Sequence, residues 1–299
     1  MAKYRALIIA GGAFFALARS AGAADLLPPP PALEPPPPVA YEFNGWYLRG
    51  DAGLGVNATK PSLAVSPDPL AGGGYSAAAT NDFYNPTISS SGIFDIGFGY
   101  QFNSWFRGDI TEEYRGGSHF QTLEVLNDSG ATPNIQYADF YRGDLSSWVT
   151  MFNGYADLGT WYGVTPYVGG GLGFAYNKLS GFTDSGYASD ASTGGVPVPA
   201  GGYSGDGGKW NFAWGLMAGL SFDVTQNLKL DLGYRYLDYG KFTSGSSRCL
   251  SATTAGFGGC DWVVHSKNEL ASNDFRIGLR WMLGGESYAP PQMPLVRKY

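Results

Sequence analysis

The chain has 299 residues, of which 15% are charged and 15% aromatic, and 45 of them are glycine. A mean hydropathy of -0.13 excludes a membrane protein built from many spanning helices. The net charge of -6, without a cluster of Lys and Arg, excludes nucleic acid as a partner, because phosphate binding needs such a patch. Low charge combined with many glycines and aromatics favours many short strands flanked by aromatic belts.

Residues 1–23 have the features of a secretory signal peptide. Lys3 and Arg5 precede an apolar stretch, and Ala21 and Ala23 supply the small residues of a cleavage site. The apolar stretch is shorter than the roughly 20 residues that a permanent spanning helix needs. We therefore expect an exported protein whose mature chain begins after Ala23.

The segment 24–43 contains two runs of proline, at 28–31 and 35–38. Proline lacks the backbone donor of helices and sheets and favours the extended polyproline II conformation. We interpret the segment as a periplasmic spacer, and a role as a polyproline ligand stays open.

Eight segments then alternate between apolar and polar residues with a period of two. Each is about ten residues long, which matches a tilted strand that crosses a bilayer. The segments are 46–54, 92–102, 105–114, 147–158, 165–177, 209–223, 228–236 and 275–283.

The two faces of these segments differ in a way that favours a membrane barrel over a soluble sheet. In 92–102, Phe94, Ile96 and Phe98 share one face, and Asp95 lies with glycines on the other. A soluble barrel would bury the large apolar side chains and expose the charges. We expect the apolar face to contact lipid, with glycine and charge in the lumen.

The connections between the segments alternate between short and long. The short ones are 103–104, 159–163 and 225–227, and the long ones are 57–91, 116–146, 178–208 and 241–271. Outer-membrane barrels have short periplasmic turns and long external loops. The predicted fold is therefore all-β: an eight-stranded antiparallel up-and-down transmembrane β-barrel over 44–283, with four long external loops and a periplasmic tail, 284–299.

Several short motifs follow one another in order along the chain. After an Ala-Asp-Leu start at 24–26 they are WYLRGDAG at 46–53, FDIGFGY at 94–100, PYVGGG at 166–171 and LGYRY at 232–236. In these motifs the chain resembles the small eight-stranded outer-membrane barrels of the OmpA transmembrane type, and among them the alphaproteobacterial porin-family surface proteins. The resemblance covers about 44–283 and implies the outer membrane of a Gram-negative bacterium, with its lipid and lipopolysaccharide as partners.

The last predicted strand also resembles the signal by which the barrel-assembly machinery recognises such proteins. Gly278, Trp281 and Leu283 occupy the positions of its glycine and its alternating bulky apolar residues. Most members end there in an aromatic residue, whereas this chain continues to Tyr299. The tail is too short to be the peptidoglycan-binding domain of larger relatives.

The predicted lumen face carries a nearly balanced set of acids and bases. Side chains fill the interior of an eight-stranded barrel, so buried charges there must be paired. Pairing would hold the barrel shut, and the alternative is a narrow ion path gated by rearranged pairs. The predicted lumen charge network is Arg49, Asp51, Asp95, Arg107, Asp109, Glu113, Asp157, Lys229, Asp231, Arg235, Arg276 and Arg280.

The two cysteines, Cys249 and Cys260, fall in the fourth predicted external loop. In an exported protein such a pair favours a disulfide, and a metal site or reactive thiol would need His or acidic neighbours. The external loops are rich in Gly, Ser, Thr, Asn, Asp and Tyr. They could bind external surface ligands or serve as solvated coverage.

The sequence offers little for an enzyme. The only histidines, His119 and His265, fall in predicted loops, and a triad is defined by geometry that loop neighbours do not establish. We find no metal-ligand spacing, and the run Gly169–Gly171 lies inside a predicted strand. We expect no catalytic residues, no cofactor and no metal.

These observations predict an outer-membrane barrel that contributes to envelope structure and surface display, with a lumen closed by paired charges. Two alternatives remain: a low-conductance porin or channel for small solutes, and a loop-mediated surface binder or adhesin.

Overall fold

The computed structural model describes residues 45–71, 75–251, 256–260 and 262–284. The predicted signal peptide and proline-rich segment, and the tail after residue 284, lie outside them. Among the described residues no helix is long and apolar enough to cross a membrane. The elements are β1 (Gly45–Asn57), β2 (Leu63–Ser66), β3 (Ala79–Ile88), β4 (Ser91–Gln101), β5 (Phe106–Asp128), β6 (Ile135–Asp157), β7 (Val164–Ser189), the 3-10 turn η1 (Ala191–Thr193), β8 (Val198–Ser204), β9 (Gly207–Asp223), β10 (Leu228–Gly240), β11 (Ser247–Ser251), β12 (Gly256–Gly259), β13 (Val263–Ser266) and β14 (Leu270–Met282).

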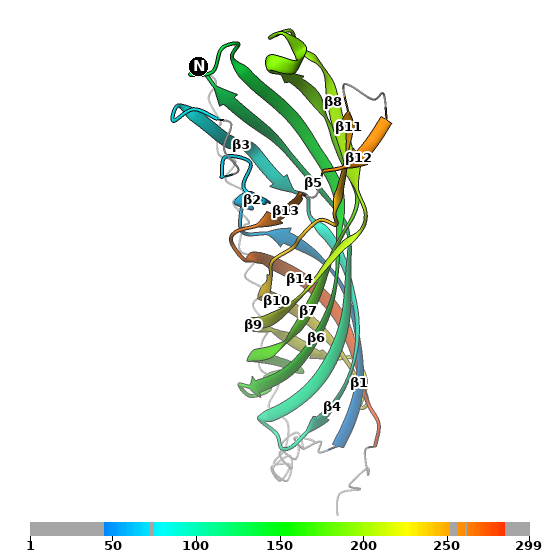
Figure 1. Ribbon diagram of the computed structural model, residues 1–299. Helices are drawn as coiled ribbons and strands as arrows, with labels where there is room; N and C mark the ends of the chain where they lie inside the picture. The colour runs from blue at the N-terminus through cyan, green and yellow to red at the C-terminus, as the bar shows by residue number, and fades with distance from the viewer. Residues whose placement is uncertain (1–44, 72–74, 252–255, 261, 285–299) are drawn as a thin grey trace, which may run out of the picture. The chain divides into compact units, whose positions relative to one another are not determined.

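Antiparallel pairing closes the main sheet into a barrel (Figure 1). Around the ring, β1 pairs with β4, and then β5, β6, β7, β9, β10 and β14 follow in turn until β14 pairs with β1 again. Each of these strands therefore has a neighbour on both sides. Closure satisfies the backbone donors and acceptors that an open sheet would leave at its edges.

The structure confirms which face of the strands points outward. Phe94 and Ile96 of β4 are 66% and 72% exposed, whereas Asp95 between them is buried. Glu112 of β5 is an exception on the outward face, where its carboxylate accepts a hydrogen bond from Thr150 of β6. An unpaired carboxylate facing lipid is costly, and this bond provides a partner.

Lumen-facing glycines make room for the large side chains that fill the interior. A Cβ added to Gly99 of β4 would collide with the ring of Tyr47, its partner on the neighbouring β1, which lies over Gly99 and reaches Asp109 of β5. By contrast, a Cβ on the outward Gly50 would make an ordinary contact, 3.7 Å from the Asp95 carbonyl oxygen. The glycine-rich lumen face seen in the sequence is thus a packing requirement of the tyrosines and arginines opposite it.

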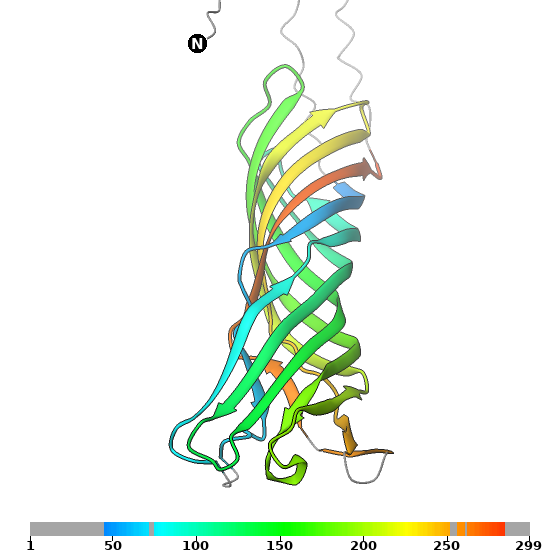
Figure 2. The same cartoon turned by 90° about the horizontal axis from the view of Figure 1, so that it is seen from above.

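The expectation that the long connections are loops is wrong in large part. β5, β6 and β7 continue well past the ends predicted for them (Figures 1 and 2). β3 pairs with β5, β8 pairs with β7, and β11 pairs with β8. We call this region the extended sheet: 115–128 of β5, 135–147 of β6 and 177–189 of β7, with β3, β8 and β11. η1, β2, β12 and β13 also lie in the predicted loops.

β-bulges explain why the sequence pattern hid these continuations. The register shifts between Arg115 and Ser118, and again between Arg142 and Asp144. Gly117 and Gly181 lie at these two shifts with φ of 75° and 58°, values that favour glycine. The extra residue lies in β5 at the first shift and in β7 at the second, and it exchanges the two faces of those strands, so their two-residue alternation breaks. β6 keeps its alternation, but its outward residues change from apolar to polar.

The outward face changes character at the bulges. In β6, Trp148 and Phe152 point outward on the barrel, whereas Asp144 and Arg142 are the exposed side chains beyond it. Apolar and aromatic side chains suit lipid, and charged ones suit water. The extended sheet therefore stands outside the apolar band of the barrel.

We expect Gly99→Ala to lower the free energy of unfolding by about 1–3 kcal/mol, because overpacking forces the Tyr47 ring to move. Gly50→Ala, on the outward face of the neighbouring strand, is the matched control and should change stability little. Urea unfolding in lipid vesicles, followed by tryptophan fluorescence, measures both. Equal stability of the two variants would contradict the packing role of Gly99.

Candidate functional site

Near the short-turn end of the barrel, two arginines lie against acids and aromatic rings. Arg107 Nε lies 3.2 Å from Asp157 Oδ1, and its guanidinium carbon lies 4.1 Å from the ring centre of Tyr155. Arg280 Nε lies 3.2 Å from Asp231 Oδ2. These contacts combine ion pairing with cation–π attraction at positions shielded from water.

The middle of the lumen is organised around Arg49. Its guanidinium lies 2.8 Å from Asp51 and 3.0 Å from Asp109, and it donates a 2.8 Å hydrogen bond to the Tyr155 hydroxyl. Tyr47 donates to the same Asp109 carboxylate. Each acid here has a cationic or hydroxyl donor, as buried carboxylates require.

Towards the extended sheet the pairs join into one network. Arg276 pairs with Asp95, lies 3.6 Å from Asp51, and lies 3.9 Å from Glu113. Glu113 then bridges two more arginines, 2.9 Å from Arg115 and 2.7 Å from Arg235.

Asp274 completes the network at this level. Its carboxylate lies 2.9 Å from Arg115 and 2.7 Å from Arg235. Glu113 and Asp274 therefore each contact both arginines, and the four side chains form a closed square of ion pairs. All four side chains are almost completely buried. Such an arrangement neutralises each charge locally, where an unpaired one would cost several kcal/mol.

The structure thus gathers eleven of the twelve predicted lumen residues and places Lys229 elsewhere. Lys229 lies at the start of β10 and pairs with Asp223 at 2.6 Å, partly exposed at the mouth of the barrel. It follows directly on the short turn before β10, where its long chain reaches the neighbouring strand end rather than the interior. Among the described residues it forms no ion pair with the other eleven.

Arg115, Asp274 and the lumen tyrosines are members that the sequence interpretation missed. Arg115 was one residue past a predicted segment, and Asp274 one residue before another. Their positions in the strands could have revealed them, because every second residue of a strand shares a face. Arg115 lies on the same face as Arg107 and Glu113, and Asp274 lies on the same face as Arg276.

The paired charges leave almost no free space. The cavity between Arg49, Tyr155, Tyr167 and Arg235 has a volume of about 10 Å³. That volume is at the lower limit for holding one water molecule.

An apolar cluster covers the network on the side of the extended sheet. The Arg115 guanidinium carbon lies 5.1 Å from the ring centre of Tyr239, which belongs to this cluster. Phe120 and Phe242 meet within it at 5.4 Å between ring centres. β2 and β13 pair with each other and contribute Leu63 and Val264. An apolar layer thus lies directly against the paired charges.

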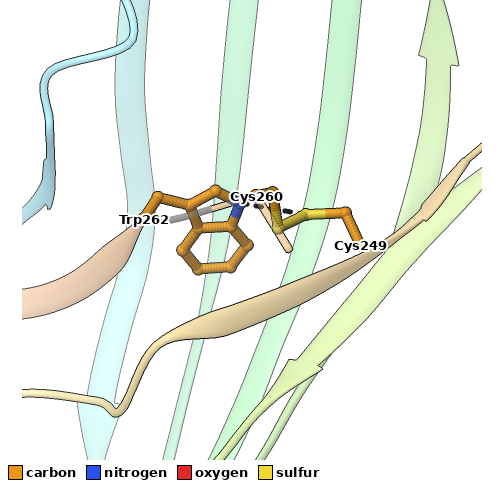
Figure 3. Close-up of a disulfide and its surroundings, with 3 residues drawn as sticks. All are labelled: Cys249, Cys260 and Trp262. Carbon is orange, nitrogen blue, oxygen red and sulfur yellow. Dashed lines mark hydrogen bonds between the residues drawn. A yellow bond between two sulfur atoms is a disulfide. The ribbon is translucent and has the colours of Figure 1, made fainter. Parts of the chain in front are cut away.

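The disulfide prediction is confirmed, with Cys249 of β11 bonded to Cys260 (Figure 3). The Trp262 indole donates a hydrogen bond to Cys249 Sγ at 3.1 Å. The bond therefore ties β11 to the segment that leads into β13.

The remaining predicted positions fall on different parts of the fold. On β14, a Cβ added at Gly278 would collide with the Asp51 side chain. Trp281 of the same strand points outward, and Leu283, just after the strand, is also exposed. His119 lies 2.6 Å from Asp144 on the outer side of the extended sheet, and His265 lies in β13 opposite Ala64. The described residues contain no group of three or more His, Cys, Asp or Glu side chains that could hold a metal.

Comparison with known proteins gives a consistent result. The sequence model of the outer membrane protein beta-barrel domain matches residues 16–282. An uncharacterized protein of Brucella abortus is 32% identical over 205 residues, which are 64% of this chain and 67% of that protein. The outer membrane protein PagN of Salmonella typhimurium is 27% identical over 79% of this chain and 89% of its own length. A putative adhesin of Rickettsia conorii is 28% identical over 75% of this chain and 79% of its own length.

We expect Arg235→Met to lower the free energy of unfolding by about 3–5 kcal/mol, because it leaves Glu113 and Asp274 with one arginine between them. Lys229→Met breaks a partly exposed pair and should cost at most about 1 kcal/mol. Urea unfolding of both variants in vesicles provides the measurement. A small effect at Arg235 would show that the network does not hold the barrel together.

Proposed function

This chain belongs to the outer membrane protein β-barrel domain family and is located in the outer membrane of a Gram-negative bacterium. On that premise we propose that it forms an eight-stranded barrel with a closed lumen. The barrel supports the envelope and displays the extended sheet outside the cell. The ring of β1, β4, β5, β6, β7, β9, β10 and β14 supports the strand count.

The observation that carries the closed lumen is a chain of buried ion pairs that runs from Asp109 through Arg49, Asp51, Arg276 and Glu113 to Asp274. Two separate pairs, Arg107 with Asp157 and Arg280 with Asp231, add to it near the short-turn end. Opening a path would require separating buried partners such as Arg235 and Glu113, 2.7 Å apart. Breaking one buried pair costs several kcal/mol, and a path would break more than one. The apolar cluster around Phe120 and Phe242 adds a second barrier, because ions cross an apolar layer poorly.

The lengths of the connections support the orientation. β4 and β5 are joined by 102–105, β6 and β7 by 158–163, and β9 and β10 by 224–227, all at one end of the barrel. Short turns are typical of the periplasmic side. The other end, with the extended sheet and the disulfide, then faces the oxidising exterior.

The last strand fits recognition by the barrel-assembly machinery. Trp281 and the exposed Leu283 present bulky apolar groups toward lipid at the end of β14, and Gly278 lets Asp51 approach the strand from β1. On this basis we assign Gly278, Trp281 and Leu283 to the assembly signal. Membrane lipid and lipopolysaccharide surround the outward apolar face.

A second candidate function, binding of an external surface partner, is favoured by exposed aromatic side chains on the extended sheet. Tyr84, Phe140 and Tyr187 are each more than two-fifths exposed there. Rigid aromatic side chains supply contact area at low entropic cost. The relation to a putative adhesin accords with this candidate.

In planar bilayers the purified, refolded barrel should give no stable single-channel steps, because the lumen charges are paired. The Arg115→Ala, Arg235→Ala double variant opens part of the network and serves as the comparison. Stable steps in the unmodified protein that change when lumen charges are replaced would refute the closed lumen.

Replacing residues 118–145 by a short turn removes the β5–β6 part of the extended sheet. Bacteria that carry this variant should attach less to surfaces, because the exposed aromatic face is reduced. Slower migration of the boiled protein on a gel verifies that the barrel still folds. Unchanged attachment by a folded variant would discount the binding candidate and leave the closed barrel unaffected.

A further inference from the structure

A cavity of about 300 Å³ lies within the extended sheet, apart from the lumen network. Three acids from three adjacent strands line it: Glu124 of β5, Asp139 of β6 and Asp184 of β7. Tyr75, Tyr137 and Trp262 add aromatic walls. We call this space the acidic cavity. Its size falls in the range of small-molecule sites, and its lining combines aromatic surface with convergent polar groups.

The acids of the cavity lack the cations that neutralise those of the lumen. No Lys or Arg of the described chain forms an ion pair with Glu124, Asp139 or Asp184. Glu124 and Asp139 are directly opposite each other in the β5–β6 register. Like charges at opposite positions destabilise a sheet unless a cation lies between them. In the lumen, Arg276 has that position between Asp51 and Asp95, and Glu124 and Asp139 have no such arginine.

The carboxylates are only partly satisfied by hydrogen bonds. Glu124, only 6% exposed, accepts bonds from Tyr141 and from Asn81 Nδ2. Asp184 Oδ1 is fully buried and has no hydrogen-bond partner among the described residues. A buried carboxylate with an unpartnered oxygen is costly, and a cation held in the cavity beside it would reduce that cost by neutralising its charge.

We propose that the acidic cavity binds an organic cation: an alkylammonium or guanidinium group carried on a carbon chain. The acids would accept its hydrogen bonds, and the aromatic rings would contact its carbon chain and its positive charge. A bare metal ion fits less well, because the described residues hold no group of three acids close enough to share one. The negative lining disfavours anions.

Such a group has two sources, a free polyamine and a Lys or Arg side chain of a partner protein. The inference rests on the proposed surface display, since either source must reach the cavity from outside the cell. It also names the chemistry that the binding candidate would recognise.

Proton exchange gives the site a distinctive pH dependence. Burial, together with the charges of the neighbouring acids, raises the pKa of Asp139 to about 8, and burial raises the pKa of Asp184 to about 7. A raised pKa means that the empty site holds protons near neutral pH, and a bound cation favours their release. Affinity should therefore increase as the pH rises through this range. The other titratable groups around the two acids are Tyr75, Glu124, Asp128, Tyr137, Tyr141 and Asp190.

The test is titration calorimetry of the refolded full-length barrel in vesicles with spermidine, at pH 8.5 and pH 6. We expect binding at pH 8.5, proton uptake by the buffer, and an affinity at least tenfold lower at pH 6. An arginine-containing peptide and a lysine-containing peptide distinguish a partner side chain from a free polyamine. Tighter binding of calcium than of every organic probe would overturn the proposal in favour of a metal site.

The double variant Asp139→Asn, Asp184→Asn should lose at least tenfold in affinity for spermidine. It removes buried like charges, so it should fold at least as well as the unmodified barrel, and gel migration checks this. Asp144→Asn, on the outward face of the same β6, is the matched control and should bind normally.

Unchanged affinity in the double variant, or no binding of any organic probe at pH 8.5, would overturn the inference. Because this assay uses purified protein and does not measure conductance, its failure would leave the closed-barrel proposal standing.

Discussion

The pairing of charges inside the barrel is the interaction on which the rest of the structure depends. Lipid outside the ring requires apolar side chains there, so the alternating strands turn their polar residues inward. The lumen is narrow and leaves about 10 Å³ around Arg49 and Tyr155, so these residues are shielded from water and must satisfy one another. The closed square of Glu113, Arg115, Arg235 and Asp274 shows the solution, with every acid shared between two bases.

The two bulges mark where the barrel passes into the extended sheet, whose outward residues differ from those of the barrel. Past Gly117 and Gly181 the strands keep their hydrogen bonds but change their outward residues from apolar to polar. On the inward side, the lumen charges give way to the apolar cluster around Phe120. One set of continuous strands therefore supports both a membrane-embedded ring and an ordered sheet beyond it.

The carboxylates of the lumen and those of the acidic cavity differ in whether arginines lie beside them. Asp274 and Glu113 in the lumen each contact two arginines, which neutralise their charge. Asp139 and Asp184 in the extended sheet have no such partners and repel each other. Buried groups that destabilise a fold are candidates for binding, and this contrast directs the search for a ligand to the acidic cavity.

The sequence by itself determined the ring strands, the assignment of their faces, the short turns and most of the lumen charges. Each strand has lipid on one side and the lumen on the other, so its residues alternate with a period of two, and this pattern can be read within a single strand. It could not reveal the extended sheet, since an extra residue reverses the alternation in β5 and β7 and the outward residues of β6 turn polar. Only the tertiary structure decided that Arg115 and Asp274 join the network, that Lys229 does not, and that Asp139 and Asp184 meet in one cavity. Those outcomes depend on register between strands distant in the chain, which no local pattern records.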